Sequence, residues 1–129
     1  MHSPRPLLGS LLALVLALAL ALSLPAQQQR WEALITRAAE LNRQEKYTEA
    51  IPIAEAAVRV AETTFGSNHP NVAISLNNLA ELYREQGMYA EAEPLYLRAI
   101  SIDEKALGLD HPSLAININN LALLYDAQG

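Results

Sequence analysis

The sequence predicts an all-α solenoid, in which antiparallel helix pairs stack into about two and a half units behind an apolar leader. Three features predict it: a 42-residue internal repeat, apolar residues at helical spacing within each unit, and a nearly unbroken run of Leu, Ala and Val over residues 7–24. With 129 residues, the chain is long enough for one domain at most. We expect residues 27–129 to form that domain.

The first 26 residues are predicted to be a signal peptide. Arg5 and the free amino terminus supply a positive start, and the strictly apolar run Leu11–Leu22 fits a signal core of about 7–15 residues. We expect Pro25 to end the helical structure. The chain is then exported, either secreted or periplasmic. The alternative is an uncleaved membrane anchor, because the looser apolar stretch 7–24 approaches the roughly 20 residues of a spanning helix.

The part of the chain after the leader is acidic and contains no cysteine. Residues 27–129 carry 8 Lys and Arg against 14 Asp and Glu, a net charge of −6. Because no basic stripe is present, counterion release cannot supply affinity, and nucleic acid is excluded as a partner. The absence of cysteine excludes a disulfide framework, a zinc-thiolate site and a thiol nucleophile.

The internal repeat has an offset of 42 residues. Over residues 108–129, 13 of 22 positions repeat the residue found 42 positions earlier. The first copy is more diverged but keeps its register, because Tyr47 and Pro52 return as Tyr89 and Pro94. A repeat of this length indicates a stacked array of similar units. The predicted units are residues 29–70, 71–112 and a partial unit 113–129.

Each unit is predicted to be helix, short turn, helix and linker. In the middle unit, one apolar stripe ends near Gly87, a residue suited to a helix C-terminus, and a second stripe runs to Gly108. The first stripe consists of Val72, Leu76, Leu79, Ala80 and Tyr83. The second consists of Ala92, Leu95, Tyr96, Ala99, Ile102 and Ala106. Two facing stripes predict that the helices of one unit pack against each other.

These motifs resemble a known repeat family. Leu-Ala…Tyr in the first helix and Tyr-x-Glu-Ala…Tyr-x-x-Ala in the second are similar to a tetratricopeptide repeat, whose usual length is about 34 residues. The longer second helix, the Leu-Gly-x-Asp-His-Pro linker and the Asn-Asn-Leu-Ala run resemble the kinesin-light-chain type. The resemblance covers residues 28–129. It implies a scaffold that binds a protein or peptide segment in a concave groove.

The first unit departs from this pattern at two core positions. Arg37 stands where Leu79 and Leu121 stand in the later units, and Ala54 replaces the aromatic Tyr96. The sequence therefore leaves the packing of the first unit open, although its register is clear.

The candidate binding residues lie on the first helices of the units, away from the apolar stripe. An amide side chain both donates and accepts, so it can bind an extended backbone of any sequence. In the family that these residues resemble, groove asparagines bind peptide backbone. The alternative is that one asparagine of each pair bonds to the neighbouring helix. The candidates are Asn77, Asn78, Glu81, Arg84, Asn119, Asn120 and Asp126.

The charges of this predicted groove favour a mixed-charge or basic peptide. Related grooves that clamp a terminal carboxylate use Lys and Arg, whereas here Arg84 has Glu81, Glu85 and Asp126 nearby. The alternative for Arg84 is a simple pair with a neighbouring acid.

The recurring histidines, His69 and His111, are predicted to have a structural role in the linkers between units. Equivalent points on successive units lie about 8–10 Å apart, too far for His69 and His111 to share one metal ion. We expect Asn68 and Asp110 to cap the helices that follow. The sequence contains no nucleophile with a nearby base, no glycine-rich phosphate loop and no Cys/His ligand spacing. We therefore expect no enzyme activity, no metal and no cofactor.

The last helix carries apolar residues on most of its circumference, although repeat arrays usually finish with a polar capping helix. Three hypotheses remain, of which the first is favoured. The chain is a protein-binding module, an amino-terminal fragment or recruiting arm of a larger enzyme or signalling protein, or a self-associating structural protein that forms a homodimer through this helix.

Overall fold

The computed structural model describes the backbone of residues 7–129 and the side chains of residues 9–20 and 25–129. The positive start predicted around Arg5 lies outside the described residues. In the described part, all regular structure is helical. The helices are α1 (Leu7–Arg43), α2 (Tyr47–Phe65), α3 (Pro70–Glu85), α4 (Tyr89–Leu107) and α5 (Pro112–Gln128).

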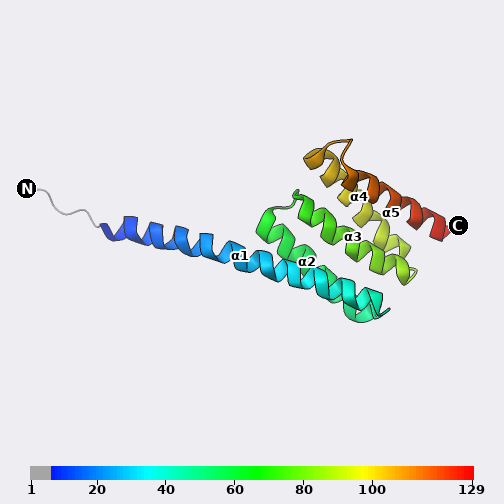
Figure 1. Ribbon diagram of the computed structural model, residues 1–129, viewed down its shortest axis with the longest axis horizontal. Helices are drawn as coiled ribbons and strands as arrows, with labels where there is room; N and C mark the ends of the chain where they lie inside the picture. The colour runs from blue at the N-terminus through cyan, green and yellow to red at the C-terminus, as the bar shows by residue number, and fades with distance from the viewer. Residues whose placement is uncertain (1–6) are drawn as a thin grey trace, which may run out of the picture.

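The helices stack in chain order (Figure 1). Each helix packs against the next, and the first helices of successive units, α1, α3 and α5, are also neighbours. The structure therefore confirms an all-α solenoid of stacked helix pairs, in which α3 and α4 form the complete middle pair.

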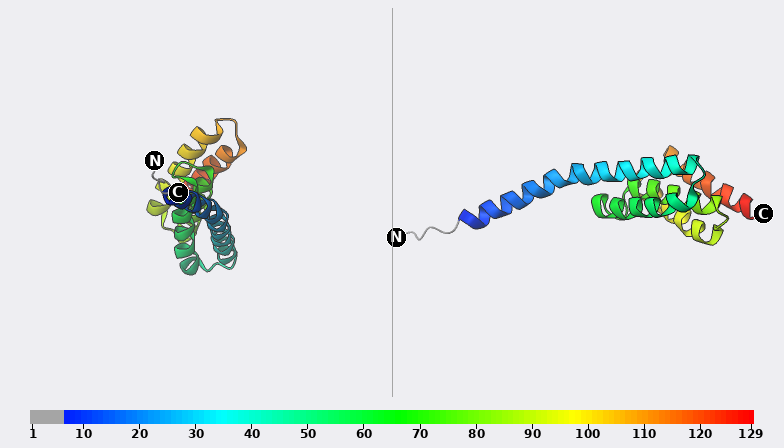
Figure 2. Two further views of the ribbon diagram at one scale, coloured as in Figure 1. Left: turned by 90° about the vertical axis from the view of Figure 1, so that its left-hand side faces the viewer. Right: turned by 90° about the horizontal axis from the view of Figure 1, so that it is seen from below.

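Helix α1 joins the leader to the first unit in one continuous element. Its amino-terminal half extends away from the array, and the side chains of residues 9–20 are all exposed (Figures 1 and 2). The expectation that Pro25 ends the helix is wrong, because α1 continues through Pro25 to Arg43. A proline removes a single backbone donor, and the Ala and Gln residues that follow favour helix.

The described residues include one helix, α1, that is long and apolar enough to cross a membrane. Its most apolar stretch of 18 residues has a mean hydropathy of 2.2, and none of that stretch is buried against the array. Signal sequences near an amino terminus have the same properties.

The first unit packs in the same register as the others. Ala54 is buried, and Trp31 adds a large side chain that lies edge to face against Phe65, with ring centroids 5.4 Å apart. Arg37 is exposed, whereas its equivalent Leu79 is buried against the first unit. The difference follows from position, because α1 has no described helix pair on its outer side. Arginine there gives the array a polar edge.

A histidine at the end of each linker between units caps the helix that follows. His69 Nδ1 accepts a hydrogen bond from the backbone N–H of Asn71 at 3.0 Å, and His111 Nδ1 accepts one from Ser113 at 3.1 Å. The prediction that Asn68 and Asp110 cap these helices is wrong, because the capping position falls one residue later. The ring of His69 also stacks on Phe65, at 5.0 Å. A ring nitrogen can satisfy an otherwise unpaired N–H as a hydroxyl or carboxylate would.

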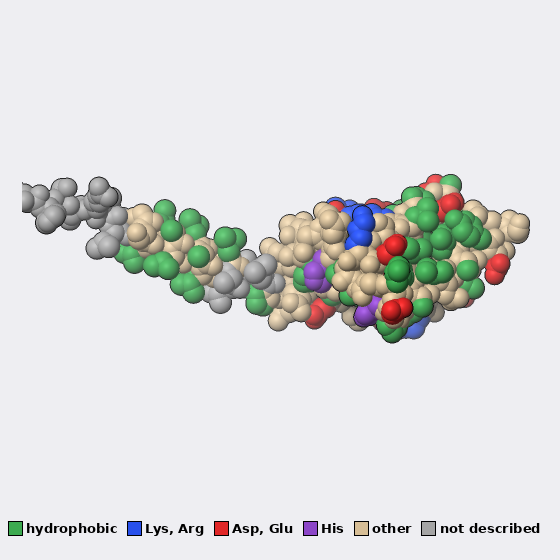
Figure 3. Space-filling view, turned by 90° about the horizontal axis from the view of Figure 1, so that it is seen from above, with side chains coloured by type: hydrophobic (Ala, Val, Ile, Leu, Met, Phe, Trp, Pro, Cys, Tyr) green, Lys and Arg blue, Asp and Glu red, His purple; other side chains and the backbone are tan. Residues whose placement is uncertain are grey.

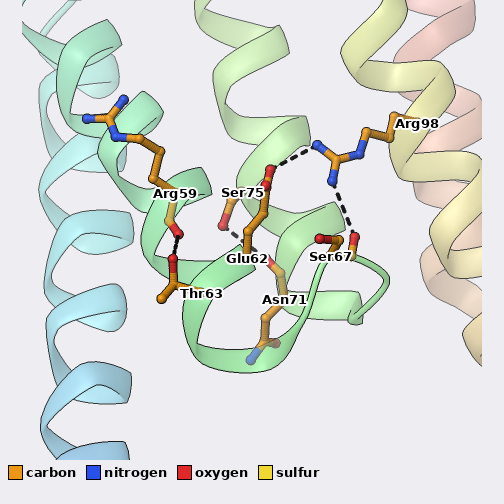
Figure 4. Close-up of polar contacts among 7 residues, drawn as sticks. All are labelled: Arg59, Glu62, Thr63, Ser67, Asn71, Ser75 and Arg98. Carbon is orange, nitrogen blue, oxygen red and sulfur yellow. Dashed lines mark hydrogen bonds and ion pairs between the residues drawn. The ribbon is translucent and has the colours of Figure 1, made fainter.

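A charged contact joins the two second helices. Arg98 of α4 donates to Glu62 of α2 at 3.0 Å and to the backbone oxygen of Ser67 at 3.3 Å (Figure 4). This side chain therefore holds α4 against both the preceding unit and its linker.

The α5 end of the array exposes a large apolar surface, which gathers there in the space-filling view (Figure 3). Leu124 and Leu114 face inward and are buried, whereas Ile118 is 51% exposed and Tyr125 45% exposed. The residues of α3 equivalent to Ile118 and Tyr125 are Leu76, which is buried, and Tyr83, which is half-buried. Helix α3 packs against both α2 and α4, whereas no described helix follows α5.

Candidate peptide-binding cleft

A cleft of about 370 Å³ opens between α3 and α5, the first helices of two successive units. Amide and acidic side chains line it together with two exposed isoleucines, Ile74 and Ile116. The full lining is Ile74, Asn77, Asn78, Glu81, Asp103, Ser113, Ile116, Asn117 and Asn120. The cleft therefore combines apolar contact area with groups that can bind a polypeptide backbone.

The structure separates the roles of the two asparagines of the first predicted pair, Asn77 and Asn78. Asn77 donates through Nδ2 to Asn117 Oδ1 on the neighbouring helix α5, so it joins two units. Asn78 and its repeat equivalent Asn120 line the cleft and have no hydrogen-bond partner among the described side chains. The alternative that one amide of each pair serves the neighbouring helix thus applies to Asn77, which leaves Asn78 and Asn120 available.

Two residues that line the cleft, Asn117 and Asp103, are not among the binding residues predicted from the sequence. Both side chains are almost fully buried, with 2% and 3% exposed. Asn117 Nδ2 donates to Asp103 Oδ2 at 2.6 Å. The sequence stripe assigned Ala106 to the core of α4, but Ala106 is exposed and Asp103 faces inward. The available signal was the repeat itself, because Asp103 replaces Ala61 and Asn117 replaces Ser75, and both of these earlier residues are buried.

A smaller cleft of about 60 Å³ continues the same face between α1 and α3. Asn78 and Glu81 line both clefts, and Asn42 of α1 donates to Glu81 Oε1 at 3.2 Å. The two clefts therefore lie along one face that the first helices α1, α3 and α5 form together.

The comparisons with known proteins agree with this arrangement. A family model described as tetratricopeptide repeat matches residues 31–105 and 77–129, which together cover more than half of the chain. The chain belongs to the tetratricopeptide repeat family. Tetratricopeptide repeats generally mediate protein–protein interaction, and such domains typically bind protein partners. A search of curated proteins finds no match to the chain.

Three predicted binding residues of this tetratricopeptide array lie outside the cleft. Asn119 and Asp126 are exposed on the side of α5 on which no described helix packs. Arg84 pairs with its neighbour Glu85 at 3.1 Å and is only 16% exposed, as in the alternative predicted for it. Among the residues that line the α3–α5 cleft, none is Lys or Arg, so its charge comes from Glu81 and Asp103 alone.

In the tetratricopeptide array, tyrosines of two first helices donate hydrogen bonds to glutamates of the preceding second helices. Tyr125 of α5 donates to Glu93 of α4 at 3.0 Å, and this hydrogen bond raises the pKa of Tyr125. Tyr83 of α3 donates to Glu55 of α2 at 3.2 Å; burial, followed by the charge of Glu55, raises the pKa of Tyr83. Glu93 of α4 therefore anchors α5.

A third cleft, of about 270 Å³, lies between α1 and α2 and is lined by Arg30 and Arg59 together with Gln27, Thr63 and Thr64. None of its lining residues comes from α3 or α5. In the described part of the chain, no group of three or more His, Asp or Glu side chains is placed to hold a metal ion.

Proposed function

We propose that this tetratricopeptide array binds an extended segment of a protein partner in the cleft between α3 and α5, without catalysis. One observation carries the proposal: Asn78 and Asn120, one repeat apart, line the same cleft and have no partner in the described chain. Unpaired amides at a regular spacing match the donors and acceptors that alternate along a polypeptide backbone. The resemblance to kinesin-light-chain repeats, in which groove asparagines bind backbone, supports the same role.

The isoleucines of the cleft supply the apolar part of the proposed contact. Ile74 is 44% exposed and Ile116 59% exposed, both beside the asparagines. Burying such side chains against a partner contributes about 25 cal/mol for each Å² removed from water. Backbone recognition with apolar contact predicts a binder that tolerates many sequences.

A selection from a random peptide display library tests this proposal. The full chain, purified in a mild detergent, is the bait, and enriched peptides are measured by fluorescence anisotropy. We expect the double variant Asn78→Ala with Asn120→Ala to lose about tenfold in affinity, because two backbone hydrogen bonds disappear. Asn119→Ala, on the same helix but outside the cleft, is the matched control and should bind normally. Enriched peptides that bind the double variant as tightly as the unmodified chain would refute the assignment.

We also propose that residues 1–26 direct export and are then removed. The exposed apolar side chains of residues 9–20, which project away from the array, support this role. The intact mass of the chain recovered from the exported fraction tests it. A mass reduced by about 26 residues is expected from cleavage, whereas a full-length chain found in the membrane fraction favours the anchor.

The apolar surface of α5 favours a second candidate function, self-association. Ile118, Leu123 and Tyr125 are each at least 45% exposed, more than an ordinary scatter of apolar side chains on one helix. Analytical ultracentrifugation should then show a mass that rises with concentration, and Ile118→Asp should abolish the rise. Leu109→Asp is the control, because Leu109 is 73% exposed but lies in the linker. A constant monomer mass at high concentration would exclude self-association.

A further inference from the structure

Asp103 is a buried carboxylate that lacks part of its hydrogen bonding. It is 3% exposed, and its Oδ2 accepts from Asn117 at 2.6 Å. Its other oxygen, Oδ1, has no hydrogen-bond partner among the described residues. A buried charge without a compensating partner is costly to a fold, so proteins seldom keep one unless a ligand or another charge completes it.

The orientation of the neighbouring amides is dictated by this carboxylate. Asn117 must turn its Nδ2 toward Asp103 and the backbone oxygen of Ala99, the latter at 3.4 Å, so its Oδ1 faces Asn77. Asn77 must then present its own Nδ2 to Asn117, which leaves Asn77 Oδ1 without a donor. Both unpaired atoms beside the cleft are therefore acceptors, and flipping either amide would place two like groups face to face.

The cleft above these acceptors carries negative charge with no cation to balance it. Glu81 and Asp103 both line it, and no Lys or Arg does. The arginines of α3 and α4 are engaged elsewhere, Arg84 with Glu85 and Arg98 with Glu62, and the exposed Lys105 of α4 is not among the lining residues. A group that fits must bring hydrogen-bond donors and positive charge together.

We propose that the cleft selects partner segments by a positively charged side chain, arginine or lysine, that reaches Asp103. The guanidinium or ammonium donates to Asp103 Oδ1 and to Asn77 Oδ1, while the segment's backbone lies along Asn78 and Asn120. Both residues line the cleft, and their unpaired oxygens are buried just beneath it. Donation to an ionised acceptor in such a shielded place is about twice as strong as a neutral hydrogen bond.

This inference rests on the proposed function, and the same peptide selection distinguishes the two. Against the unmodified full chain, we expect enriched peptides to share one Arg or Lys position. Against Asp103→Asn, that preference should disappear, while Glu104→Gln, an equal change of charge at the exposed neighbouring residue, should retain it. Replacing the shared basic residue of a selected peptide by Gln should lower affinity for the unmodified chain at least about tenfold, and for Asp103→Asn hardly at all.

Each result decides a different question. Peptides enriched without a basic position, or with one that survives Asp103→Asn, overturn the inference and leave the binding function intact. A library that yields no peptide overturns the binding function, and the inference with it. Circular dichroism establishes that Asp103→Asn is folded. If it is not, the replacement of the basic residue in the selected peptide decides the question on the unmodified chain, and an affinity that does not fall overturns the inference.

Discussion

The two junctions between units share one backbone arrangement but differ in chemistry. In the first, Trp31 donates to the Ser75 hydroxyl at 2.8 Å, and Ser75 donates to the backbone of Asn71 at 2.9 Å. In the second, Asn117 occupies the place of Ser75 and bonds to Asp103, which occupies the place of an alanine, Ala61. At the first junction, Trp31 and Ser75 both have hydrogen-bond partners in apolar surroundings. At the second junction, Asp103 Oδ1 and Asn77 Oδ1 lie beside a cleft and have no partner among the described residues. The unpaired acceptors of the described residues therefore lie at one of two otherwise equivalent junctions.

The contrast shows that the chemistry of one junction can change while the fold of the repeat array is kept. Helix lengths, linkers and capping histidines are repeated, so two substitutions at buried positions are enough to change one junction. Buried polar networks are stabilising only when their members are satisfied. The unsatisfied junction is for this reason the one expected to have a ligand.

The largest expected change in stability comes from comparing one repeat position in two units. It tests whether the helix that follows decides how deeply the residue at that position is buried. Leu76 is 1% exposed beneath α4, and its repeat equivalent Ile118 is 51% exposed. We expect Leu76→Ala to reduce the free energy of unfolding by about 2–5 kcal/mol, because it leaves a cavity. Ile118→Ala should change it by no more than about 0.5 kcal/mol. Urea denaturation of the two variants measures both; equal losses would show that the face of α5 is covered in solution.

A second prediction breaks the polar junction. Asn117→Ala removes the donor to Asp103 and should cost about 1–3 kcal/mol of unfolding free energy. The paired change Asp103→Ala with Asn117→Ser, which gives these two positions the residues found at Ala61 and Ser75, should cost much less, because no buried charge is left without a partner. Thermal unfolding of the single and paired variants checks this order. A paired variant less stable than Asn117→Ala would mean that the second junction depends on its carboxylate.

A third prediction concerns the first junction. Trp31→Phe keeps an aromatic ring but loses the hydrogen bond to Ser75, with an expected cost of about 1 kcal/mol. Ser75→Ala should cost about the same, and the double variant little more than either, since both remove one interaction. Denaturation midpoints of the four proteins in this cycle measure the coupling. Fully additive losses would show that the hydrogen bond contributes nothing.

The smallest effect at neutral pH is expected for Tyr96, a buried tyrosine at the second junction. Burial raises the pKa of Tyr96 to about 12, and its hydroxyl has no partner among the described residues. Tyr96→Phe should therefore leave stability at pH 7 almost unchanged. The neutral phenol is favoured in the fold, so stability should fall as pH rises from about 10, the unfolded value, toward 12. The variant should show a smaller fall, measured by unfolding at each pH together with tyrosinate absorbance.

Much of the fold was predictable because it depends on residues close together in the chain. The 42-residue offset, the apolar stripes around Leu76 and Tyr96, and the helix-ending glycine at position 87, whose φ is 73°, are all local patterns. Local sequence was a poor guide where helix formers outweighed a breaker, as at Pro25, and where the capping position was one residue later, as at His69 and His111.

The sequence by itself determined the repeat, the helix pairs and the family, because periodicity and turn residues act within single helices and their linkers. Only the tertiary structure decided which side chains form the cleft. Asn77 and Asn78 are adjacent in the chain and chemically identical, yet one bonds across to α5 while the other stays free. Asp103 and Asn117 meet only because α4 and α5 pack together. A site made between helices depends on the angle at which their faces meet, which no single helix encodes.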